Sequence, residues 1–157
     1  MKIQKFVCNM FQENCYVVSD DCQQCVIIDC GALYPEESQA IISYIKDANL
    51  TPVHLLSTHG HFDHMLAADD LRDEYGIPII ACAAEQQVLT DSIKNLSGSW
   101  ASAHVLLADQ WVCDGKKLEL AGFSIEVFHT PGHTVGGCCY YLPKEHRLFS
   151  GDTLFCA

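Results

Sequence analysis

Short apolar runs separated by turn residues open the chain and predict a β-rich beginning. Lys2–Cys8, Cys15–Ser19 and Cys25–Asp29 have the length and composition of strands. Within the third, Val26–Ile28 is apolar without alternation, which is typical of a strand buried on both faces. We therefore expect this strand inside a sheet that is covered on both sides.

The first helix is predicted to begin at Pro35. Proline suits the first turn of a helix, and Glu36 and Glu37 place negative charge beside the positive end of the helix dipole. Apolar residues then recur at helical spacing and define the face that packs on a sheet: Ile41, Ile42, Ile45 and Ala48.

Strands and helices alternate through the middle of the chain. Strands are predicted at Val53–Ser57 and Ile77–Ala81, with a helix between them that ends at Gly76. A further helix is predicted over Ala83–Ile93, whereas residues 95–114 show no clear pattern. The last part of the chain is predicted to contain strands only: Leu118–Leu120, Phe123–Phe128, Gly137–Leu142 and Arg147–Ser150.

The order of these elements indicates sheets with helices packed outside them. A length of 157 residues suits a single domain, residues 1–157, with room for a buried core. No apolar run approaches the roughly 20 residues that span a bilayer, and the N-terminus lacks the apolar stretch of a signal peptide. We therefore expect a cytoplasmic protein.

The strongest chemical signal is a cluster of four polar side chains directly after a predicted strand. His59, His61 and Asp63 are spaced two apart, so at a strand end they point the same way, and His64 follows at once. Neutral imidazole nitrogen and carboxylate oxygen are ligands that Zn²⁺ accepts. The pattern predicts a metal-binding loop.

Two later loops offer further ligands. His133 and Asp152 each follow a predicted strand and lie in a loop that contains glycine. Functional side chains are often placed on loops at strand ends. Alone, each would be an ordinary loop residue, but together with the first cluster they complete a coordination set.

Charge and cysteine content narrow the function further. The formal net charge of −11 disfavours nucleic acid and anionic membranes as partners. Ten cysteines are many for this length, but most lie in apolar strand-like runs, so we expect reduced, buried thiols. Cys22 and Cys25 have the C-x-x-C spacing without a second pair, and a hairpin turn is the favoured interpretation there.

Three motifs together resemble the metallo-β-lactamase superfamily, and specifically its glyoxalase II-like (hydroxyacylglutathione hydrolase-like) branch. They are Thr-His-x-His-x-Asp-His at residues 58–64, Gly-His-Thr at 132–134 and Gly-Asp-Thr-Leu-Phe at 151–155. The run Val-Ile-Ile-Asp-Cys-Gly at 26–31 also matches the early family strand that ends in Asp-x-Gly. The resemblance covers essentially the whole chain and implies an α+β fold, the αββα sandwich of two sheets with helices outside.

The resemblance also implies a role for each ligand. His59, His61 and His133 would bind a first metal, Asp63 and His64 a second, and Asp152 would bridge the two. Zn²⁺ is the expected ion, one or two per chain, with iron or manganese as alternatives. A water or hydroxide between the metals would be the nucleophile, with Asp63 and Asp152 as the catalytic carboxylates. Asp29 would support the metal loop.

The sequence departs from the family at its end. The family continues with further strands, a helix and a later histidine that completes the second metal site, whereas Gly-Asp-Thr-Leu-Phe here is followed by two residues. We expect either a fragment that is truncated at its C-terminus or a naturally short version, and an end inside a sheet favours the fragment. An incomplete sheet would leave an open edge, so we also expect homo-oligomers through these strands.

Three functions follow from this resemblance. The first is a hydrolase that cleaves a small-molecule thioester or related ester. The second is a persulfide dioxygenase, which would hold one iron by His59, His133 and Asp152. The third is a metal-binding protein without catalytic activity. Metal identity, oxygen uptake and thioester cleavage distinguish them.

Overall fold

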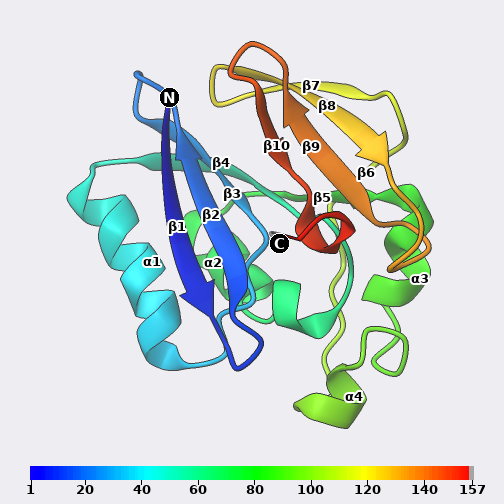
Figure 1. Cartoon of the computed structure of the whole chain (residues 1–157). Coiled ribbons are helices and arrows are strands. Elements are labelled where there is room, and N and C mark those ends of the chain that lie inside the picture. The colour runs from blue at the N-terminus through cyan, green and yellow to red at the C-terminus, as the bar shows by residue number, and fades with distance from the viewer. Residues whose placement is uncertain (156–157) are drawn as a thin grey trace.

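The computed structural model describes residues 1–155, which form two β-sheets (Figure 1). The larger sheet has the order β1-β2-β3-β4-β5-β6, and the smaller has the order β10-β9-β8-β7. The strands of the larger sheet are β1 (Lys2–Cys8), β2 (Glu13–Ser19), β3 (Gln24–Ile28), β4 (Thr51–Leu56), β5 (Ile79–Cys82) and β6 (Gln110–Val112). Those of the smaller sheet are β7 (Lys117–Leu120), β8 (Phe123–His129), β9 (Cys138–Leu142) and β10 (Arg147–Phe149).

The helical segments are short apart from the first two. They are α1 (Pro35–Asp47), α2 (Ala68–Tyr75), α3 (Gln86–Leu89) and α4 (Ser97–Trp100), with 3₁₀ turns η1 (Phe62–His64), η2 (Ala83–Glu85) and η3 (Gly151–Thr153). Helix α1 begins at Pro35, as predicted. At the N-terminus of this helix, the Glu37 carboxylate accepts hydrogen bonds from the backbone amides of Leu33 and Tyr34. Helix α2 ends at Gly76 in the left-handed conformation, as the sequence predicted.

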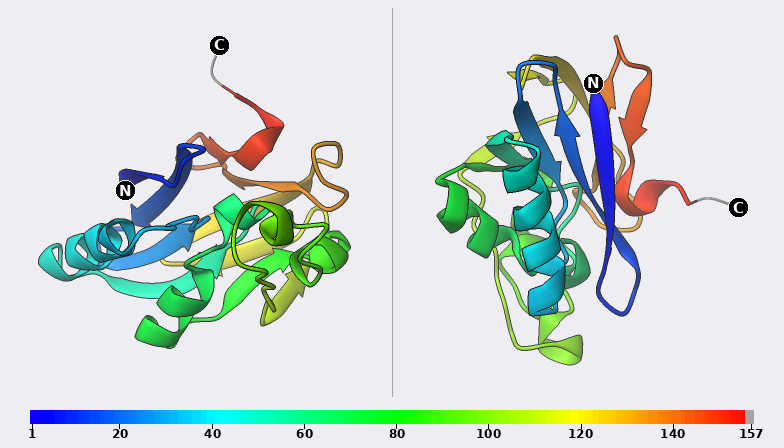
Figure 2. Two further views of the ribbon diagram at one scale, coloured as in Figure 1. Left: turned by 90° about the horizontal axis from the view of Figure 1, so that it is seen from below. Right: turned by 90° about the vertical axis from the view of Figure 1, so that its left-hand side faces the viewer.

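Two apolar layers lie on opposite sides of the larger sheet. On β3, Cys25 and Ile27 pack toward α1 and α2, whereas Val26 and Ile28 pack toward the smaller sheet. This alternation explains the uninterrupted apolar run, because both faces of β3 are buried. Figures 1 and 2 show α1 on the side of the larger sheet that faces away from the smaller one.

The predicted helix over Ala83–Ile93 is wrong in its extent, because helical structure ends at Leu89. Asp91 Oδ1 accepts the amides of Ile93 at 2.9 Å and Lys94 at 3.3 Å. Aspartate side chains that bond nearby amides offer the backbone an alternative to the helix. Local turn chemistry therefore overrides the apolar spacing.

The smaller sheet presents part of its apolar surface to solvent. Phe128 and Tyr141 stack with ring centroids 5.8 Å apart, and Phe128 and Leu148 are exposed. The association that we predicted through these strands stays a prediction. Among the described residues, no helix is long and apolar enough to cross a membrane.

The strand ends determine where the functional loops lie. Strands β3, β4 and β5 run parallel, so their carboxyl ends meet at one edge of the larger sheet. The Tyr140 hydroxyl on β9 donates to Ser57 O at 2.8 Å, and the Cys138 amide donates to Thr58 O at 2.8 Å. These bonds fasten the smaller sheet to the same edge, so loops from both sheets converge there.

Candidate metal centre

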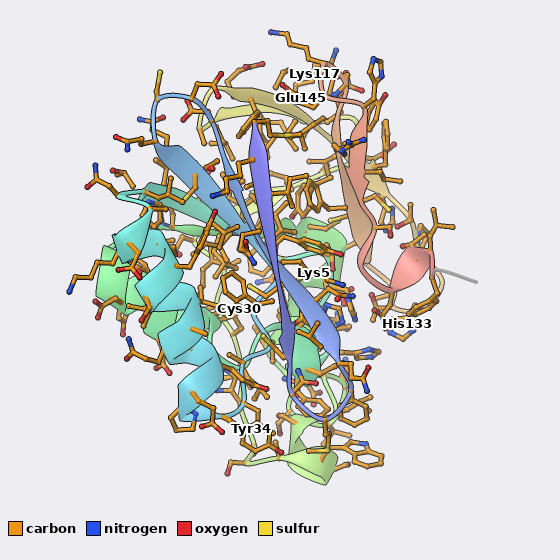
Figure 3. All side chains as sticks on the ribbon, turned by 60° about the vertical axis from the view of Figure 1, so that its left-hand side comes forward. Lys5, Cys30, Tyr34, Lys117, His133 and Glu145 are labelled. Atoms are coloured by element: carbon orange, nitrogen blue, oxygen red, sulfur yellow. The ribbon has the colours of Figure 1, made fainter. Side chains whose placement is uncertain are left out.

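All six predicted ligands come from loops at this shared edge, although the loops lie far apart in the sequence. The segment after β4 carries four of them, which are His59, His61, Asp63 and His64. His133 lies between β8 and β9, and Asp152 follows β10. Figure 3 shows His133 next to η3, the turn that contains Asp152. The structure therefore brings together the side chains that the three motifs singled out.

Three imidazole rings form what we call the three-histidine group: His59, His61 and His133. One ligand nitrogen from each lies within 4.8 Å of the others. His61 Nδ1 and His133 Nε2 are 2.8 Å apart, and the His59 ring centroid is 5.0 Å from each of the other two. The rings meet through their nitrogens, which is the arrangement that three ligands of one ion require.

The second set, which we call the acidic group, contains Asp63, His64 and Asp152. His64 Nε2 lies 3.2 Å from Asp152 Oδ1 and 3.8 Å from Asp63 Oδ2. His59, His64 and Asp152 also form a compact set of ligand atoms, whereas Asp63 belongs to none of the compact sets among the described residues. Asp63 is thus close to His64 but less tightly grouped than the other ligands.

Asp152 connects the two groups through its separate oxygens. Its Oδ1 faces His64, and its Oδ2 lies 3.3 Å from His133 Nε2. A carboxylate placed in this way can offer one oxygen to each of two neighbouring cations. Burial acts to raise the pKa of Asp152, but the hydrogen bond to His64 and the charges of the neighbouring imidazoles together outweigh burial and lower this pKa, so the carboxylate stays ionised.

Asp29 sets the orientation of two of the histidines. Its Oδ2 is 3.0 Å from His64 Nδ1 and accepts the Thr58 hydroxyl at 2.7 Å, and that hydroxyl is 3.2 Å from His59 Nδ1. If each Nδ1 carries the proton, both Nε2 atoms keep a free lone pair. Such partners fix the tautomer and direction of metal-binding imidazoles.

The electrostatics differ from one imidazole to the next. Burial lowers the pKa of His59 well below its usual range, and burial together with the neighbouring His133 lowers the pKa of His61. Burial acts the same way on His64, but its bonds to Asp152 and Asp29 outweigh it and raise the pKa well above the usual range. His59 and His61 therefore favour the neutral ring, the state in which imidazole binds metal.

The donor set fits a metal ion. Among the described residues, His59 Nε2 is buried without a hydrogen-bond partner, although buried polar atoms are nearly always paired. His59 belongs to the same compact set as His61 and His133. Nitrogen and carboxylate donors of this kind suit Zn²⁺, and imidazole also suits iron.

The loop that carries the predicted ligands His59–His64 is held in place by contacts that sequence patterns alone do not reveal. Asn9 donates through Nδ2 to Gly31 O at 2.8 Å and to Asp63 O at 2.9 Å. A Cβ on Gly31 would lie 1.5 Å from Asp63 O, so only glycine fits. Glu13 is also buried here, with Oε1 4.0 Å from His64 Nδ1, and burial raises its pKa well above the usual range. Neither Asn9 nor Glu13 belongs to one of the sequence motifs that indicated the site.

The remaining histidines lie outside the compact sets of the described residues: His54, His104, His129 and His146. His129 instead supports the loop of His133, with Nε2 3.0 Å from Val135 O. A small pocket opens beside the ligands. Its lining combines His59, His133 and Asp152 with hydroxyl side chains of Thr58, Thr130, Thr134, Ser150 and Thr153.

Comparisons with known proteins identify the fold. The chain is 36% identical over 158 residues to the probable metallo-hydrolase YqgX of Bacillus subtilis, covering 99% of this chain and 72% of that protein. It is 32% identical to the hydroxyacylglutathione hydrolase GloC of Haemophilus influenzae, covering 99% and 73%. The crystal structure of the BLEG-1 B3 metallo-beta-lactamase superposes with a TM-score of 0.90 at 36% identity, covering 99% and 74%.

The family assignment follows from sequence and structure together. The two-sheet architecture predicted from the sequence is confirmed by the superposition on BLEG-1. The profile of the Metallo-beta-lactamase superfamily matches residues 8–156, nearly the whole chain. The chain therefore belongs to the metallo-beta-lactamase superfamily.

Proposed function

We propose that the chain is the metal-binding part of a hydrolase that cleaves a thioester or related ester, in the manner of a glyoxalase II. The observation that carries this proposal is Asp152, whose two oxygens face His133 at 3.3 Å and His64 at 3.2 Å. The similarity to a hydroxyacylglutathione hydrolase supports the substrate class.

In this proposal His59, His61, His133 and Asp152 would hold one ion, and Asp63, His64 and Asp152 would hold a second. When bound, such ions lower the pKa of water toward neutrality and polarise a carbonyl oxygen. The carboxylate of Asp63, partly exposed beside His64, can accept a proton during the reaction. Asp29 and Thr58 keep the imidazole nitrogens aimed inward, so that the ligands need little rearrangement.

The test is elemental analysis combined with a thioesterase assay on a hydroxyacylglutathione. We expect zinc, with release of free thiol that depends on the metal. Iron together with oxygen uptake on a persulfide would support the dioxygenase instead. Metal binding without turnover of either substrate would support a metal-binding role only, and a protein without metal would contradict the proposed centre.

A further inference from the structure

One buried carboxylate contacts both loops that carry the three-histidine group. Glu85 ends η2, directly after β5, and its side chain is buried. Its Oε1 accepts the amide of Gly60 at 2.9 Å, and its Oε2 accepts the amide of Gly136 at 2.6 Å. Gly60 lies between His59 and His61, so one of the two bonds acts on the ligand loop itself.

The other bond acts on the loop of His133. Gly136 is three residues beyond His133 and 51 residues from Glu85 in sequence. A Cβ on Gly136 would lie 2.1 Å from Glu85 N, and a Cβ on Gly60 would lie 3.0 Å from Leu89 N. Both loops therefore pack their backbones directly against the segment from η2 to α3.

The chemistry of the side chain matters because both partners are donors. A carboxylate can accept a hydrogen bond at each oxygen, whereas an amide has one accepting oxygen and one donating NH₂ group. Hydrogen bonds to an ionised acceptor are also stronger than neutral ones. Glutamine at this position could therefore satisfy only one of the two glycine amides.

We infer that Glu85 is a positioning residue that fixes the separation of His61 and His133. Those two histidines come from loops 72 residues apart in sequence, yet their ring nitrogens are 2.8 Å apart. Glu85 binds a main-chain amide in each loop and does not contact the ligand atoms in the described hydrogen bonds. The inference rests on the metal centre proposed above, for which His61 and His133 are ligands.

The first test compares Glu85→Gln with Asp109→Asn in the full chain. Asp109 Oδ2 accepts the amide of Ile79 at 2.8 Å at the start of β5, the opposite end of that strand. We expect Glu85→Gln to weaken Zn²⁺ binding by about 10- to 100-fold, the usual effect of losing an outer partner of a metal ligand. Asp109→Asn should bind Zn²⁺ as the wild type does.

Two spectroscopic measurements separate positioning from plain structural support. With Co²⁺ as the probe, Glu85→Gln should change the visible absorption of the bound ion, and Asp109→Asn should not. In the metal-free protein, the ring ¹⁵N signals of His61 and His133 should shift in Glu85→Gln alone. This second measurement decides the inference even if the wild type binds no metal and the proposed function fails.

The inference would be overturned if Glu85→Gln had the same zinc affinity, Co²⁺ spectrum and histidine ring signals as the wild type. Equal losses in Glu85→Gln and Asp109→Asn would also overturn it, because the effect would then follow general destabilisation. If Glu85→Gln does not fold, Glu85→Asp replaces it in the same measurements. Its shorter side chain keeps both oxygens but cannot span the same two amides, so the same changes are expected.

Discussion

The three-histidine group and the acidic group are neighbours, yet they are built from different chemistry. His59, His61 and His133 present nitrogens to one another, and burial or mutual repulsion keeps His59 and His61 neutral. His64 is instead surrounded by carboxylates, with Asp29 at 3.0 Å, Asp152 at 3.2 Å and Asp63 at 3.8 Å. The three-histidine group contains no carboxylate, whereas the acidic group pairs His64 with the carboxylates of Asp63 and Asp152.

The difference has a consequence for metal binding. With Asp152, the three-histidine group offers four ligands, the number that closes a tetrahedral zinc site. The acidic group offers three, and Asp63 is the least tightly placed of them. We therefore expect the three-histidine group to bind metal more tightly, with Asp152 as the residue on which both groups depend.

The largest effect is expected from Asp152→Ala, because this change removes a ligand from both groups. Thioester hydrolysis should fall by more than about 100-fold. This is more than the usual loss when the residue removed only hydrogen-bonds to a metal ligand. Metal content after dialysis should fall as well. Asp47→Ala, at an exposed position at the end of α1, serves as the control and should change neither quantity. Similar effects of the two substitutions would contradict the proposed site.

A comparison of His61→Ala with His64→Ala tests the order of affinities between the groups. At limiting zinc, the wild type should hold one ion, and His61→Ala should lose it because only two imidazoles remain in that group. His64→Ala should keep the ion, since His64 lies in the other group. Elemental analysis after dialysis measures both. Equal zinc loss in the two variants would show that the groups do not differ as inferred.

A smaller effect is expected from Asp29→Asn. The backbone should tolerate it, because Asp29 has a φ of 53° and asparagine also adopts this left-handed conformation. The new NH₂ group cannot accept the Thr58 hydroxyl or the His64 ring proton. Zinc affinity should fall by about 10- to 100-fold. Competition with a chelator measures it, and wild-type affinity would exclude Asp29 from orienting the ligands.

The strands and the candidate ligands could be predicted from the sequence because both depend on local patterns. The apolar run of β3 and the spacing of His59, His61 and Asp63 are visible within a few residues. The motif residues lie at strand ends, so the topology brings them together. The prediction of a helix as far as Ile93 was wrong. In the structure the Asp91 side chain accepts the Ile93 amide and forms a turn. A single aspartate is a weaker signal in the sequence than the helical spacing of apolar residues, so the sequence alone did not show this turn.

The contacts that support the ligands could not be predicted in the same way. Glu85 accepts a hydrogen bond from Gly136, which is 51 residues away in the sequence, and Asn9 donates one to Asp63, which is 54 residues away. An isolated Glu or Asn in sequence indicates an exposed side chain, since these residue types are seldom buried. Only the packed fold shows that Glu85 and Glu13 are enclosed.

The smallest effect on metal content is expected at Cys22 and Cys25, which we predicted to form no metal site. Cys22 is exposed in the turn between β2 and β3, where Asp20 Oδ1 accepts its amide at 2.9 Å. Cys25 is fully buried on β3, and burial with the charge of Asp20 raises the pKa of its thiol to about 12. Metal binding needs the thiolate, which this burial disfavours.

Replacing both cysteines with serine should therefore leave the zinc content unchanged. The double variant should be less stable, because serine at position 25 places a hydroxyl in an apolar layer at a cost of about 1–3 kcal/mol. Cys22→Ser alone should have the wild-type melting temperature, which assigns the loss to Cys25. A zinc loss in the double variant that matches the loss in His61→Ala would show that the turn belongs to a metal site after all.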